Sequence, residues 1–231
     1  FHEVQEKFIQ AFRGAMPFDS TRLPAALDQL DEILDAVAAE FAENLAPAIP
    51  RVWNTEVEEI RTDLRGWLRH LATVDNDWRP VEVEFPFGRD DTPVSLSGYR
   101  VKGRIDLIER HTARGELRIT DHKTGRSEQR FLYVGGGAVL QPVLYALAAE
   151  QARGETVHRS RLFYCTQRGE YREIETPLNA TARQAAVEVL AAIDHAIASG
   201  FLPAAPQQDA CKACDFHSAC GPYEEIRSRR K

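Results

Sequence analysis

The chain has 231 residues, 35 acidic and 29 basic side chains, and a formal net charge of −6. Its hydrophobic fraction of 43% and charged fraction of 28% exclude a wholly disordered chain, and the length suits one domain with an appended lobe. No stretch approaches the ~20 consecutive apolar residues of a membrane span, and no signal peptide opens the chain, so we expect a soluble, cytoplasmic protein. Taken alone, the negative charge argues against binding to nucleic acid. Phe1 at the first position suggests a piece of a longer polypeptide.

Apolar residues recur at helical spacing through the first third of the chain. The pattern predicts helices over residues 1–13, 23–45 and 52–74, each with a charged opposite face. We expect these helices to form a lobe over residues 1–78.

From Val81 onward the apolar residues alternate instead, which is typical of strands. We expect strands over 81–87, 94–109 and 117–122, a helix over 138–152, a hairpin of 160–167 and 170–176 turning at 168–169, and a helix over 180–199 closed by Gly200. This order predicts an α/β fold, a mixed sheet flanked by helices. The core would cover residues 79–200, with the helical lobe as an insertion before it and a cysteine-bearing segment over 201–231 after it.

The chemistry is concentrated in two strands of this core. Asp106 lies inside the first strand, where a carboxylate is costly to bury unless it is paired or bound to metal. Asp121 and Lys123 share one face of the second strand because side chains two apart point the same way. If the strands pair, the two carboxylates meet and form an oxygen-rich site suited to Mg²⁺ or Mn²⁺. The alternative is that Asp121 and Lys123 are turn residues and that Asp106 pairs with Arg104 or Arg118.

Two helical pairs add to this set. Gln141 and Tyr145 lie four residues apart on one face of the following helix, and both can hydrogen-bond a phosphate or a water. His2 and Glu6 have the same spacing on the first helix, although a histidine there is most simply a solvent-facing residue.

Together these motifs resemble the RecB/AddB branch of the PD-(D/E)xK nuclease superfamily, whose fold is restriction-endonuclease-like. The most specific stretch reads GRIDLIE…LRITDHKTG, with Ile105 in place of a proline before Asp106. The resemblance implies that His2, Asp106, Asp121 and the carbonyl of His122 bind the metal. It implies that Lys123 is catalytic and that Gln141 and Tyr145 support the site and the scissile strand, with Glu6 in an indirect role.

Cys211, Cys214 and Cys220 form a C-x₂-C-x₅-C motif after the last helix. Clustered cysteines inside a cell favour a metal over a disulfide, either zinc, with His217 completing the site, or an iron–sulfur cluster. The resemblance implies a [4Fe–4S] cluster whose fourth cysteine lies upstream of His2. Cys165 is the other candidate for that ligand, or else a small buried core residue. Such a cluster would pin the C-terminal segment to the first helix.

The acidity is unevenly distributed. Residues 19–46 contain seven acidic residues and one basic residue, and the rest of the chain is formally neutral. The remainder is therefore compatible with an electropositive track for DNA.

We accordingly expect a Mg²⁺-dependent, exonucleolytic deoxyribonuclease. It would be the nuclease domain of a helicase–nuclease in DNA double-strand-break repair and recombination, with DNA and a helicase subunit as partners. The alternative is a non-catalytic DNA-end or partner-binding module that keeps the nuclease fold. The intact set of Asp106, Asp121 and Lys123 favours the enzyme.

Overall fold

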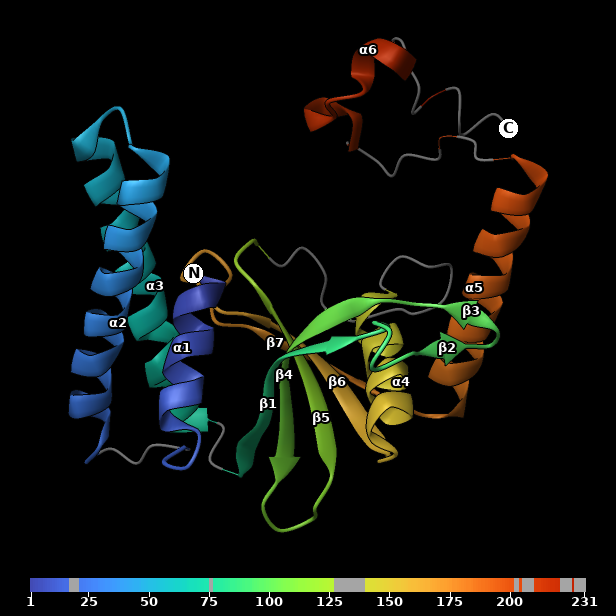
Figure 1. Cartoon of the computed structure of the whole chain (residues 1–231), viewed down its shortest axis with the longest axis horizontal. Helices are drawn as coiled ribbons and strands as arrows, with labels where there is room; N and C mark the ends of the chain where they lie inside the picture. The colour runs from blue at the N-terminus through green and yellow to red at the C-terminus, as the bar shows by residue number, and fades with distance from the viewer. Residues whose placement is uncertain are drawn as a thin grey trace. The chain divides into compact units, whose positions relative to one another are not determined.

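The computed structural model describes residues 1–16, 21–74, 77–126, 140–201, 204, 210–220 and 226 (Figure 1). The chain divides into two compact units, Phe1–Val189 and Leu190–Lys231. The three-part division expected from the sequence, with borders after residues 78 and 200, stays a prediction. No helix built from the described residues is both long enough and apolar enough to cross a membrane.

Three helices open the first unit: α1 (His2–Phe12), α2 (Leu23–Leu45) and α3 (Pro50–Val74). Their apolar faces meet in one core, in which Phe8, Leu30 and Trp67 are fully buried. The charged faces remain outside, as the helical periodicity predicts. The expected helices are confirmed, with α3 beginning two residues earlier than its apolar pattern.

A mixed five-stranded sheet follows, in the order β1-β4-β5-β6-β7. Its strands are β1 (Trp78–Phe87), β4 (Gly103–His111), β5 (Leu117–Lys123), β6 (Val157–Tyr164) and β7 (Glu173–Pro177). Only the β5–β6 pair is parallel; the other neighbouring pairs are antiparallel. A parallel pair needs a crossover, and α4 (Gln141–Arg153) lies in that connection and packs on both strands. The predicted α/β class with a mixed sheet and flanking helices is confirmed.

Several expected strand boundaries are wrong, most clearly in two places. The strand predicted over 94–109 is interrupted, because Ser97 and Gly98 both have positive φ (51° and 89°) and turn a small hairpin of β2 (Ser95–Leu96) and β3 (Tyr99–Arg100). The hairpin predicted to turn tightly at 168–169 instead has a loop from Cys165 to Arg172, in which Glu170 and Tyr171 have positive φ. Alternation of apolar residues does not report such backbone conformations.

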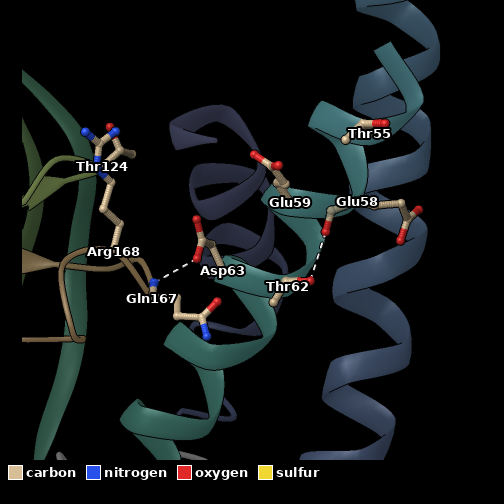
Figure 2. Close-up of a pocket in the computed structure, with 8 residues that line it drawn as sticks. All are labelled: Thr55, Glu58, Glu59, Thr62, Asp63, Thr124, Gln167 and Arg168. Carbon is tan, nitrogen blue, oxygen red and sulfur yellow. Dashed lines mark hydrogen bonds between the residues drawn. The ribbon is translucent and has the colours of Figure 1, made fainter. Parts of the chain in front are cut away.

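The two faces of β5 have different neighbours. Arg118, Thr120 and His122 lie on the face that packs against α3, where the rings of His122 and Trp67 are in contact. Asp121 and Lys123 lie on the opposite face, where Lys123 reaches Gln141 of α4. Beyond the end of β5, α3 and the β6–β7 loop line a cavity of about 560 Å³ (Figure 2).

The chain ends in α5 (Ala180–Ser199), η2 (Ala210–Ala213) and α6 (His217–Cys220). Gly200 follows α5 with a φ of 66°, the left-handed conformation expected of a glycine that closes a helix.

Candidate metal and catalytic site

Asp106 and Asp121 leave neighbouring strands side by side. Leu107 pairs with Thr120 across the antiparallel β4–β5 ladder, so the next positions along are Asp106 and Asp121. The Oδ2 atom of Asp106 accepts a hydrogen bond from the backbone N–H of His122 at 2.7 Å. The convergence expected from the sequence is therefore present in the fold.

The alternative pairing of Asp106 with an arginine is wrong. Arg104 pairs with Glu84 at 3.5 Å, and the buried Arg118 pairs with Glu109 at 3.0 Å. Neither arginine therefore pairs with the Asp106 carboxylate. Its oxygens remain available to groups at the N-terminal end of α1.

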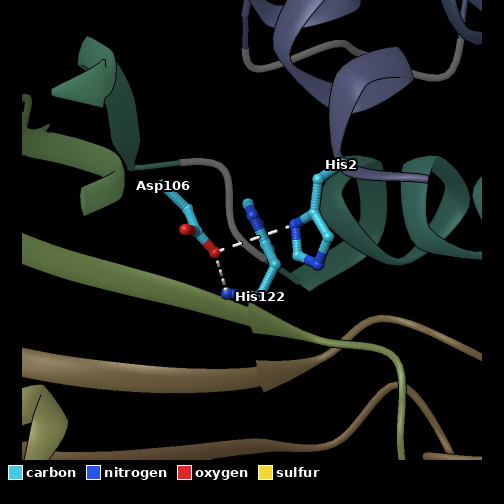
Figure 3. Close-up of side chains that lie close together, drawn as sticks. All are labelled: His2, Asp106 and His122. Carbon is cyan, nitrogen blue, oxygen red and sulfur yellow. Dashed lines mark hydrogen bonds and ion pairs between the residues drawn. The ribbon is translucent and has the colours of Figure 1, made fainter. Parts of the chain in front are cut away.

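His2 comes to this carboxylate from the first turn of α1. Its Nδ1 lies 3.9 Å from Oδ2 of Asp106, and candidate ligand atoms of His2, Asp106 and His122 all lie within 4.8 Å of one another (Figure 3). Burial lowers the pKa of His2 against the opposing effect of Asp106, which favours a neutral imidazole that can bind a metal. A histidine that the helical pattern alone would place in solvent is thus part of a three-residue cluster.

The ring of His122 lies on the core side of β5. Its centroid is 6.1 Å from that of Trp67 and 5.9 Å from that of Phe163. Burial, together with the nearby charge of Arg161, lowers the pKa of His122 to about 3, so the ring is neutral at physiological pH.

On the opposite face, four polar side chains form a continuous chain. Lys123 Nζ lies 2.6 Å from Oδ2 of Asp121 and donates a hydrogen bond to Oε1 of Gln141 at 2.9 Å. Gln141 Nε2 in turn donates to the hydroxyl of Tyr145 at 3.0 Å, across one turn of α4. The expected strand residues and the expected helix residues are therefore brought together at one site.

The Asp121 carboxyl is almost completely buried. Burial raises its pKa to about 6, although the ion pair with Lys123 opposes this, and the charge of Asp106 adds to the increase. Two carboxylates this close repel each other unless a cation lies between or beside them. Carboxylate oxygens are the donors that Mg²⁺ and Mn²⁺ prefer, so the chemistry of Asp106 and Asp121 suits a divalent cation of this class, and His2 lies within reach of Asp106.

Sequence reasoning missed Glu84. It lies in β1 between residues paired with Leu107 and Ile105, hence opposite Asp106, and it has a φ of 49°. Burial, and then the charges of Asp106 and Glu6, raise its pKa. Glu84 takes a regular polar position in the alternation of β1, between Val83 and Phe85, so the pattern did not single it out, and its position beside Asp106 depends on strand register.

Cys165 lies beneath the site. The thiol is fully buried and donates to the carbonyl of Lys123 at 3.4 Å, and the backbone N–H of Cys165 donates to the same carbonyl at 3.0 Å. Burial raises the pKa of this thiol to about 12, so it stays protonated. Cys165 therefore fits the role of a core residue better than that of a cluster ligand.

The other three cysteines lie in the second unit. Cys211 is on η2, Cys214 follows it, and Cys220 ends α6. The backbone N–H of Cys214 donates to the carbonyl of Cys211 at 3.5 Å. All four cysteines of the chain are among the described residues, and none forms a disulfide. The side chain of His217, the candidate fourth ligand for zinc, lies outside the described atoms.

Comparisons with known proteins match between about half and nearly all of the chain. A family model described as the PD-(D/E)XK nuclease superfamily matches residues 1–221. An ATP-dependent helicase/deoxyribonuclease subunit of Symbiobacterium thermophilum is 28% identical over 162 residues, which are 64% of this chain and 14% of that protein. The "Gene 69 protein" of Mycobacterium phage D29 is 29% identical over 134 residues, 57% of this chain and 46% of that protein. The "Gene 69 protein" of Mycobacterium phage L5 is 28% identical over 145 residues, 62% of this chain and 45% of that protein. The chain thus spans less than half the length of these relatives.

Proposed function

The chain belongs to the PD-(D/E)XK nuclease superfamily, and from that premise we propose that it is a metal-dependent deoxyribonuclease. One observation carries the proposal: Lys123 forms an ion pair with Asp121 and a hydrogen bond with Gln141. Asp121 lies on the strand next to that of Asp106. A scaffold that only binds a partner does not require a lysine held between a buried carboxylate and an amide.

In this proposal His2, Asp106, Asp121 and the carbonyl of His122 hold Mg²⁺ or Mn²⁺. A bound divalent cation would supply Lewis-acid chemistry, offsetting phosphate charge and making water more acidic. The neutral imidazole of His2 and the Asp106 carboxylate, 3.9 Å apart, fix one side of that donor set.

Lys123 has the role of placing positive charge beside the phosphate, on which negative charge develops during hydrolysis. Asp121 and Gln141 hold its ammonium group from two sides, so little reorganisation is needed when a phosphodiester arrives. In the reaction a water oxygen forms a new bond to phosphorus, and the bond from phosphorus to one sugar oxygen breaks. The water gives up a proton and the departing sugar oxygen takes one. Tyr145, through Gln141, supports this arrangement from α4.

The relative named as a helicase/deoxyribonuclease subunit supports a proposal about the wider role. We propose exonucleolytic action on DNA, within a helicase–nuclease that serves double-strand-break repair and recombination. Cys211, Cys214 and Cys220 are proposed to bind a [4Fe–4S] cluster in the same protein. The proposal rests on their close spacing in one short segment of the sequence.

Replacing either Asp121 or Lys123 tests the nuclease directly. Asp121→Ala and Lys123→Ala should each lower the degradation of linear DNA with Mg²⁺ or Mn²⁺ by about 10²-fold or more, because each removes a preorganised charge. Lys102→Ala, which removes an exposed lysine before β4, is the matched control and should leave the rate unchanged. Thermal melting followed by circular dichroism checks that the variants fold. Full cleavage by both site variants would contradict the proposal, and DNA binding without cleavage by the wild type would favour a non-catalytic module.

A further inference from the structure

Three arginines surround a cavity next to the proposed catalytic strand. The cavity has a volume of about 290 Å³ and lies where the chain leaving β5 meets the β6–β7 loop. Arg126 comes from the first segment, and Arg168 and Arg172 come from the second. Among the described residues that line it, Glu170 is the one acidic residue. The described part of the lining therefore carries an excess of positive charge.

These arginines have no side-chain partner among the described residues. Within the part of the chain that the structure describes, none of the three guanidinium groups forms an ion pair or a hydrogen bond. By contrast, the buried residues Arg118 and Arg161 of the sheet each form an ion pair with Glu109. Three arginines that line one cavity, with no ion pair to a described residue, suit an anionic ligand, since a guanidinium presents several N–H donors to phosphate oxygens.

The β6–β7 loop that lines the cavity contacts the residues that directly follow Lys123. The hydroxyl of Thr166 donates to the carbonyl of Thr124 at 3.3 Å. Gly169 packs so closely on the other segment that a Cβ atom there would lie 2.9 Å from the carbonyl oxygen of Gly125. Arg126 is three residues from Lys123, so their Cα atoms are at most about 11 Å apart. A ligand in this cavity is therefore positioned relative to the ammonium group of Lys123.

The other side of the same loop is acidic. Gln167 and Arg168 also border the larger cavity of Figure 2, whose far wall is the α3 surface bearing Glu58, Glu59 and Asp63. The backbone N–H of Gln167 donates to Asp63 at 2.7 Å and fixes the loop to that wall. Carboxylates repel a phosphodiester chain, so a strand that leaves the site is directed toward the arginine side.

We propose that Arg126, Arg168 and Arg172 bind a backbone phosphate of the DNA strand close to the scissile phosphate. The inference rests on the proposed nuclease function and adds to it a subsite for the substrate. The three arginines are positioning residues: they fix the strand, and Lys123 acts on the phosphate that the strand presents.

The test compares two triple variants with equal loss of charge. Arg126→Gln/Arg168→Gln/Arg172→Gln removes the cavity charges, and Arg51→Gln/Arg89→Gln/Arg100→Gln removes three exposed charges that line none of the described cavities. Binding of a fluorescein-labelled oligothymidylate is measured by anisotropy in EDTA, across a series of salt concentrations. The cavity variant should bind at least about 10-fold more weakly, and its salt slope should fall by about 0.7 for each phosphate that the arginines no longer neutralise. Its KM for cleavage should rise while kcat changes little, and the control should match the wild type.

The possible results separate the subsite from the nuclease. If the wild type cleaves DNA and the cavity variant binds like the control, the subsite is refuted and the nuclease stands. If the wild type binds DNA through the arginines but cleaves none with any divalent cation, the nuclease is refuted and the subsite stands. If the wild type neither binds nor cleaves DNA, the nuclease and the subsite are both refuted. Inorganic phosphate and unlabelled oligonucleotide are also compared as competitors at equal phosphate concentration. If both displace the labelled strand equally well, the cavity binds free anions and is not a DNA subsite.

Discussion

His122 offers two kinds of donor to the metal site, its ring nitrogens and its main-chain carbonyl. The ring lies between Trp67 and Phe163, on the opposite side of β5 from Asp121. One ring nitrogen of His122 also lies within 4.8 Å of candidate ligand atoms of His2 and Asp106 (Figure 3), so the ring is a possible ligand by distance. Because the ring packs against Trp67 and Phe163, we infer that the main chain of His122 is the ligand and that its ring serves the core.

Removing the His122 ring should then spare metal binding. His122→Leu keeps the main chain and an apolar side chain of similar size, so its affinity for Mn²⁺, measured by isothermal titration calorimetry, should stay close to that of the wild type. His2→Ala removes a side-chain ligand and should weaken binding by about 10-fold or more. Equal losses in the two variants would assign the ring of His122 as a ligand.

Local periodicity explains which parts of the site could be predicted from the sequence. Asp121 and Lys123 follow from the two-residue repeat of a strand, and Gln141 and Tyr145 follow from the four-residue spacing of a helix. The hydrogen bond from Lys123 to Gln141 could not be predicted, because it depends on the path of the crossover between β5 and β6. The position of Glu84 opposite Asp106 likewise depends on the β1–β4 register, which shifts between Pro80 and Glu82.

The arginine cavity was missed for a related reason. Arg126 and the pair of Arg168 and Arg172 are about forty residues apart, and they meet only because β6 lies parallel to β5. The backbone of the β6–β7 loop also departs from simple strand alternation, with Glu170 at a φ of 59°. Sites that combine the ends of parallel strands with a loop of this kind are visible only once the sheet order is known.

The proposed cluster at Cys211, Cys214 and Cys220 predicts the colour and the iron content of the protein. The protein, expressed from its complete reading frame and purified without oxygen, should be brown and contain about four iron atoms per chain. Cys214→Ser should abolish the colour because it removes a thiolate ligand. Cys165→Ser should keep the colour, because the Cys165 thiol is buried against the carbonyl of Lys123. A colourless wild type with one zinc ion per chain would contradict the cluster.

Charged side chains run across four strands on the α3 face of the sheet. Arg118 and Arg161 are almost fully buried, and both bind Glu109 at 3.0 Å. Arg161 extends the network to Glu173, which His70 of α3 contacts at 2.8 Å. The network therefore connects β4, β5, β6 and β7 with the helical lobe. Its energetic contribution depends on keeping the two carboxylates ionised.

Acid should therefore destabilise the whole first unit. Burial alone would raise the pKa of Glu109, but Arg118 and Arg161 lower it from its ordinary value of 4.5 to about 2. Burial would also raise the pKa of Glu173, and His70 and Arg161 lower it to about 2. Because the folded state has the lower pKa values, the stabilisation is complete above about pH 4.5 and is lost as the pH falls toward 2.

Urea denaturation at a series of pH values measures this loss. The free energy of unfolding of the wild type should fall between pH 5 and pH 3. Glu109→Gln should lower it by about 3–5 kcal/mol at pH 7, because two buried arginines lose their shared partner, and should flatten the acid-dependent part of the curve. Glu155→Gln breaks the partly exposed pairs of Glu155 with Arg110 and Arg153 and should change the free energy by less than about 1 kcal/mol. A wild-type curve that stays level down to pH 3, or a Glu109→Gln variant as stable as Glu155→Gln, would show that the network does not stabilise the sheet.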